Sequence, residues 1–133
     1  EFRRVLFRSV VCGGFSMPMR RGYADKVFVI TSGENMAIHA AANIAMAVEN
    51  FKDRGYAQLG GLILNRRNVK NEDAKVEELA EDIHSKVIGT LSRSELVTDA
   101  EEQKKTVIEA YPDSEMAEEY RILAGKIRTL CGI

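Results

Sequence analysis

A cysteine followed at once by two glycines is the motif in this sequence that is most suited to carry chemistry. Cys12 ends an apolar stretch that starts at Val10, and Gly13 and Gly14 come directly after it. Glycines allow a ligand to approach the backbone closely and leave peptide N–H groups free to point at an anion, and cysteine thiolates hold iron–sulfur clusters. The segment therefore suits a cluster-binding or anion-binding loop, although, taken by itself, a tight turn with a buried thiol is the more common explanation of the same residues.

Asn65 is a second candidate, because it directly follows an apolar run and its amide can pair with both the donor and the acceptor groups of a purine edge. Taken alone, it is more simply a turn residue. No G-x-x-x-x-G-K-[ST] phosphate loop occurs in the chain, and Gly125-Lys126 falls inside a predicted helix. His39 and His84 are isolated on predicted helices, where surface or packing roles are expected.

The elements that would position these residues alternate between strands and helices. Short apolar runs predict strands buried on both faces at 27–30, 59–64 and 87–91. Helical periodicity predicts helices at 36–51 and 74–84, a short helix within 92–105, and a last helix at 114–130. The acidic run of the second helix, Glu72 to Asp82, is expected to be a solvated face. This order predicts a parallel sheet with helices on both faces, and function at the carboxyl ends of the strands, after Ile30, Leu64 and Leu91.

Length and composition indicate that the 133 residues form one compact α/β domain. The formal net charge of −1 gives no electrostatic footprint for nucleic acid or an anionic membrane. No apolar run reaches the roughly 18–20 residues of a membrane-spanning helix, and a cytoplasmic location is expected. Cys12 and Cys131 are too few for a disulfide scaffold and fit a reducing compartment. Residues 1–9, EFRRVLFRS, do not continue into the pattern that follows and are expected to be a foreign segment.

Four blocks, taken together and in order, resemble nitrogenase iron proteins: VVCGGFSMPMR, VFVITSGENMA, LGGLILNRR and TVIEAYPDSEMAEEYRILAGKI. The resemblance extends from Val10 to Ile127. It implies that residues 10–133 are the C-terminal part of a P-loop-NTPase-like ATPase domain. It also implies a homodimer bridged by one 4Fe-4S cluster, in which ATP with Mg drives electron transfer to a docked catalytic partner protein.

The resemblance also implies roles for single residues. Cys12 matches the second of the two cluster cysteines of each subunit, and Arg20 lies on the surface where the partner would dock. Asn65 matches a residue that contacts the adenine base, and the Arg93 segment and Tyr120 match the region that closes over the base and ribose. Gly33 and Glu34 fall in a segment near the subunit interface, within reach of the nucleotide across the dimer.

Several positions depart from the family pattern. The phosphate loop, the first switch and the other cluster cysteine belong to an N-terminal half that this sequence lacks, so the chain alone is expected to be inactive. Cys131, at the end of the last predicted helix, does not replace the missing ligand. Ser94-Glu95 stands where the family usually has Asp-Asn, and Met116 where it has Gln, which puts the base contacts there in question. Arg20-Arg21, in place of Arg-Glu, suggests a divergent partner surface.

Three alternatives stay open at this point. One is a related reductase that serves a tetrapyrrole-reducing partner. Another is a partitioning or positioning ATPase without a cluster, against which the Cys12-Gly13-Gly14 motif argues. The third is a folded piece without activity of its own.

Overall fold

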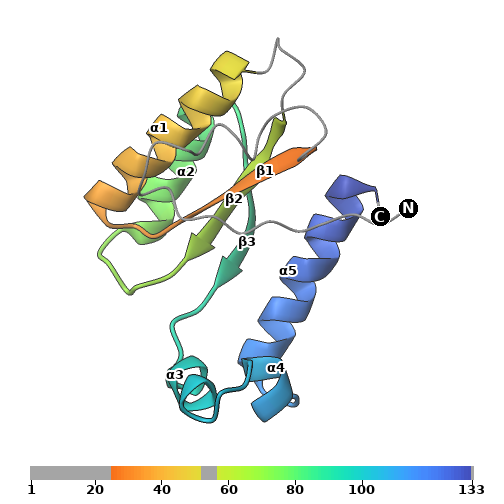
Figure 1. The fold of residues 1–133 in the computed structure, drawn as a ribbon. Helices are drawn as coiled ribbons and strands as arrows, with labels where there is room; N and C mark the ends of the chain where they lie inside the picture. Colours follow the sequence, from red (N-terminus) through yellow and green to blue (C-terminus); the bar gives the residue numbers. More distant parts are fainter. Residues whose placement is uncertain (1–24, 52–56, 133) are drawn as a thin grey trace.

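The computed structural model describes residues 25–51 and 57–132 of the chain. Within these ranges, three strands alternate with helices and two further helices follow (Figure 1). The strands are β1 (Lys26–Thr31), β2 (Gln58–Asn65) and β3 (Val87–Leu91). The helices are α1 (Asn35–Phe51), α2 (Glu72–Asp82), α3 (Glu95–Glu102), α4 (Val107–Ala110) and α5 (Glu115–Cys131). The predicted strands and the three long predicted helices are confirmed.

The three strands form a parallel sheet in the order β1-β2-β3. The pairing of β1 with β2 shifts by one residue, since Val27 lies opposite Leu59 but Phe28 lies opposite Gly61. Gly60 is the extra residue, and a Cβ there would lie 2.6 Å from the Phe28 ring. A glycine is therefore needed where the bulge brings the strand against this ring.

Helices cover both faces of the sheet, as the sequence predicts. On one face, α1 and α2 pack against Val29, Leu62 and Leu64. On the other face, α5 packs against Ile63, Ile88 and Leu91. Because successive residues of a strand point to opposite faces, the uninterrupted apolar run of β2 supplies both cores.

Serine and threonine side chains start the last three helices. A hydroxyl at the residue before each helix accepts a hydrogen bond from a free peptide N–H of the first turn, in the pairs Ser94 with Leu96, Thr106 with Glu109, and Ser114 with Ala117. The stripe predicted for the last helix is confirmed, with Met116 and Leu123 buried and Tyr120, Ile127 and Leu130 packed against the same core.

Three expectations need correction. Ile30 is 57% exposed, so within the described residues β1 is covered fully on one face only. The helix predicted at 74–84 begins at Glu72 and ends at Asp82, and His84 lies in a turn with a φ of 54° rather than on a helix. The short helix α4 lies in a segment where no separate helix was predicted, because four residues are too few to show a period. No helix among the described residues is long and apolar enough to cross a membrane.

Candidate functional site at the carboxyl ends of the strands

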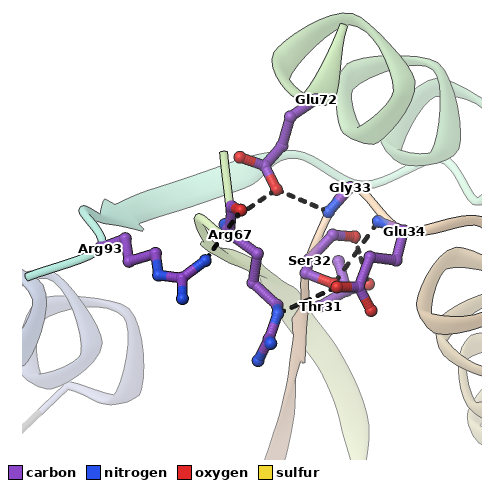
Figure 2. A network of polar contacts seen from close by, with 7 residues as sticks. All are labelled: Thr31, Ser32, Gly33, Glu34, Arg67, Glu72 and Arg93. Atoms are coloured by element: carbon purple, nitrogen blue, oxygen red, sulfur yellow. Dashed lines mark hydrogen bonds and ion pairs between the residues drawn. The ribbon is translucent and has the colours of Figure 1, made fainter. Parts of the chain in front are cut away.

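The segments that leave the three strands at their carboxyl ends are joined by polar contacts. They are 31–34 at the end of β1, 65–67 at the end of β2, and 92–93 after β3. Figure 2 shows the side chains that link them, with Glu72 of α2 above the ends of β1 and β2. The carboxyl edge of the sheet is therefore one connected site, as the parallel topology predicts.

Glu72 is the buried charge of this site. Glu72 is only 5% exposed. Its Oε2 atom accepts one hydrogen bond of 2.9 Å from the peptide N–H of Gly33 and one of 3.1 Å from the peptide N–H of Arg67. Gly33 belongs to the turn after β1 and Arg67 to the loop after β2. One carboxylate oxygen thus ties two strand-end segments to the first turn of α2.

The surroundings of Glu72 lower the pKa of its carboxyl below the ordinary value of 4.5. Burial by itself acts in the opposite direction, because it removes water from the charged form. Hydrogen bonds from the peptide N–H groups of Arg67, Gly33 and Asn68, together with the positive charge of Arg66, outweigh burial. Glu72 is therefore a carboxylate at neutral pH. The expectation that the whole run from Glu72 to Asp82 is solvated is wrong at this first residue.

Gly33 lies so close to Glu72 that no side chain fits. A Cβ at this position would lie 2.5 Å from Glu72 Cγ and 2.8 Å from its Cα. Since the Cα belongs to the backbone of α2, a rotation of the Glu72 side chain cannot relieve the contact. The glycine permits the turn after β1 to meet the start of α2.

Arg67 connects all three segments. Its peptide N–H donates to Glu72, and its Nε lies 2.9 Å from Oε1 of Glu34, in the turn after β1. Its carbonyl oxygen accepts a hydrogen bond of 3.5 Å from the Arg93 guanidinium, which follows β3. The ion pair with Glu34 is solvent-exposed and contributes little stability, whereas the hydrogen bond to the buried Glu72 carboxylate is partly buried.

A second carboxylate holds the segment after β3 from the other side of the sheet. Glu119 of α5 accepts hydrogen bonds from both the peptide N–H of Ser92, at 3.2 Å, and its hydroxyl, at 2.6 Å. The strand-end segments are thus held by one carboxylate from each helical layer.

Two of the predicted nucleotide-site residues lie on neighbouring strand ends. Asn65 is the exposed last residue of β2 and pairs with Leu91 of β3, two residues before the exposed Arg93. Tyr120 is half-buried and packs against the core between α5 and the sheet, next to the residue that binds Ser92. Cys12 and Arg20 lie outside the described residues.

Two small hollows lie beside β3. One, of about 230 Å³, is lined by residues of β2, α2, β3 and the loop between β2 and α2. Among them are Arg66 and Asp73, which form an ion pair of 3.0 Å. The other, of about 90 Å³, is lined by residues of β3 and α5. Neither of the two is lined by Asn65, Arg93 or Tyr120. Within residues 25–51 and 57–132, no group of three His, Cys, Asp or Glu side chains is arranged to hold a metal.

Sequence reasoning missed Arg67, Glu72 and Glu119. Two signals were available. Arg67 follows a predicted strand by a few residues, and Glu72 lies two residues before the start of a predicted helix, where a carboxylate interacts favourably with free N–H groups. Neither signal says that the glutamate is buried, because the turn that covers it comes from 39 residues earlier in the chain.

Solved structures of cell-division ATPases have a similar fold. The Pyrococcus furiosus cell division ATPase MinD has a TM-score of 0.65 and 14% identity over 81% of this chain. The septum site-determining protein MinD of Pyrococcus horikoshii OT3, solved with Mg-ADP, has a TM-score of 0.65 and 16% identity over 83%. The MinD cell division protein of Aquifex aeolicus has a TM-score of 0.59 and 20% identity over 84%. The chain spans only 44%, 44% and 45% of those proteins.

At these identities, the comparison establishes a P-loop-NTPase-like fold and leaves the activity open. The sequence itself is more specific. Residues 5–130 match the family described as "4Fe-4S iron sulfur cluster binding proteins, NifH/frxC family". The match includes the Cys12-Gly13-Gly14 segment and all the described strands and helices, apart from the last residue of α5. The chain therefore belongs to this iron–sulfur family.

Proposed function

We propose that this chain is part of an ATP-dependent electron-transfer protein that passes electrons from a 4Fe-4S cluster to a partner enzyme. The observation that carries the proposal is the family match over residues 5–130, with a cysteine at position 12 inside it. When bound, such a cluster supplies electrons at low potential. From this chain Cys12 would hold it, since Cys131 lies at the end of α5, within a helix remote in sequence from the glycine-rich loop.

Asn65, Arg93 and Tyr120 would bind the base and ribose of ATP. The neighbouring positions of Asn65 and Arg93 at the carboxyl ends of β2 and β3 support this assignment. The triphosphate and Mg would be held by a phosphate loop that is not in this sequence. Arg93 remains exposed while it donates to the Arg67 carbonyl, so its side chain lies where a nucleotide could reach it.

Electron transfer in this proposal takes place in a cytoplasmic homodimer, in which two copies of the chain share the cluster. A catalytic partner of the nitrogenase type would dock near Cys12 and Arg20. A tetrapyrrole-reducing partner is the alternative acceptor, and the Arg20-Arg21 pair suggests a divergent docking surface without favouring either acceptor. The first acceptor to test is the nitrogenase component.

The test is anaerobic reconstitution with iron and sulfide in the full-length protein that carries this chain, comparing wild type, Cys12→Ser and Cys131→Ser. We expect four irons per dimer in the wild type and in Cys131→Ser, and loss of the cluster in Cys12→Ser. Cys131→Ser is the matched control, because it removes a thiol that the proposal leaves without a role.

A wild-type protein that takes up no cluster but still hydrolyses ATP would overturn the redox proposal and favour a partitioning-type ATPase. A cluster that persists in Cys12→Ser would instead leave the redox function standing and overturn the assignment of Cys12. If the cluster is lost as expected, electron transfer to nitrogenase-type and tetrapyrrole-reducing partners can be measured side by side.

A further inference from the structure

The loop that follows Asn65 is anchored to its surroundings through Arg66 and Arg67. From the end of β2 it reaches α2 through residues 66–71, in which Asn68 and Asn71 adopt left-handed backbone conformations with φ of 61° and 57°. The peptide N–H of Arg66 donates a hydrogen bond to the carbonyl oxygen of Leu91 in β3. The peptide N–H of Arg67 donates a hydrogen bond to the carboxylate of Glu72. The second of these bonds connects the loop to the turn after β1, because Glu72 also accepts the peptide N–H of Gly33. The ion pair of Arg67 with Glu34 joins the same loop to the same turn at the solvent-exposed surface.

Glu72 lies at a position of α2 where packing against the sheet would favour an apolar side chain. It begins the buried face that continues with Val76, Leu79 and Ala80, and these three side chains hold α2 against the sheet. Burying a carboxylate instead of a methyl-rich side chain costs free energy unless its hydrogen bonds are made. Its presence is explained by the hydrogen bonds that it accepts from peptide N–H groups, those of Gly33 and Arg67 among them, which no apolar residue could accept.

We propose that Glu72 is a positioning residue for base recognition. By fixing Arg67 to the turn after β1, it holds the β2 end in the geometry in which Asn65 meets the adenine base. The inference rests on the proposed nucleotide site and adds a residue that does not touch the nucleotide. When a loop is already held in its binding geometry, no free energy is spent on ordering it as the ligand binds. Without Glu72, the ligand would have to order the loop, and binding would be weaker.

The two hydrogen bonds end on the same carboxylate oxygen, which makes glutamine the informative substitution. In Glu72→Gln, the amide oxygen can take the place of Oε2 and accept both bonds. In Glu72→Leu, a side chain of similar size leaves both peptide N–H groups without an acceptor. Glu78→Leu, an exposed position on the same helix, is the control for the added apolar surface.

The experiment measures equilibrium binding of ATP and of inorganic tripolyphosphate, which has no base, to the full-length protein and these variants. We expect Glu72→Leu to weaken ATP binding about tenfold and to change tripolyphosphate binding by less than about twofold. Glu72→Gln should stay within about threefold of the wild type for ATP, and Glu78→Leu should match the wild type for both ligands.

Other results would overturn the inference. Equal losses for ATP and tripolyphosphate in Glu72→Leu would show a general structural role, and no loss for either would show no role. If Glu72→Leu fails to fold, Glu72→Asp decides, because its shorter carboxylate cannot reach both N–H groups and should reduce ATP binding selectively. A wild-type protein that binds both ligands equally would refute the base site itself, and with it the proposed roles of Asn65 and Glu72.

Discussion

Ser92 is bound twice by Glu119, since the carboxylate accepts both its peptide N–H and its hydroxyl. Ser92 is the first residue after β3, and Glu119 lies in the second turn of α5, so the contact joins a strand end to the helix that covers that face of the sheet. Arg93 follows Ser92 directly. The position of its guanidinium near the Arg67 carbonyl therefore depends on a strand end that α5 holds in place.

Glu119→Ala should release the segment after β3 without unfolding the protein. The bonds lie at the surface, so we expect a loss of about 0.5–1.5 kcal/mol in the free energy of unfolding. The amide hydrogen of Ser92 loses its acceptor and should exchange with solvent faster, which hydrogen exchange followed by NMR can measure. Glu118→Ala is the control, because Glu118 pairs with Arg121 on the exposed side of α5. Unchanged exchange at Ser92 in Glu119→Ala would contradict the contact.

Glu72 should make the stability of the protein fall in acid. Its pKa is lower in the folded protein than the ordinary value of 4.5, so the unfolded chain takes up the proton first as the pH falls. The stabilisation is fully present above about pH 4.5 and is lost as the pH falls through the lower, folded pKa.

The measurement is urea unfolding of wild type and Glu72→Gln at a series of pH values. The wild type should be the more stable above pH 4.5, and the difference in free energy of unfolding should shrink below it. Other carboxylates titrate in both proteins, and the subtraction removes their contribution. A difference that stays constant from neutral pH to the acid end would argue against a lowered pKa of Glu72.

Gly33→Ala should be strongly destabilising for a substitution that adds one methyl group. The new Cβ would lie within 2.8 Å of the Glu72 backbone, so the turn after β1 and the start of α2 must move apart. Overpacking of this kind costs about 1–3 kcal/mol. Thermal unfolding measures the effect directly.

Gly125→Ala is the matched control for that substitution. Gly125 lies in α5, and a Cβ there would meet nothing within 4 Å. Alanine favours a helix interior over glycine by about 1 kcal/mol, so this variant should be more stable than the wild type. Similar effects of the two alanine substitutions would mean that the close approach at Gly33 does not exist.

Much of the fold follows from local pattern. The apolar run of β2 is long enough to supply two cores, and the stripe of α5 has the helical period throughout, so both elements were predictable from the residues themselves. The exposed Ile30 was not predictable, because an apolar run records the preference of its side chains and does not tell which neighbours cover them. The bounds of α2 shifted because its first turn is fixed by contacts with distant residues.

The candidate site divides in the same way. Residue types and order placed Asn65 and Arg93 after strands, and a parallel sheet then requires that they share one edge. Only the tertiary structure decided that Glu72 is buried, because its exposure depends on the turn at Gly33, 39 residues away in the chain, and a sequence pattern of period 3.6 carries no information about such a partner. The sequence by itself thus determined the strands, the long helices and the family, whereas long-range contact decided which charges hold the strand ends together.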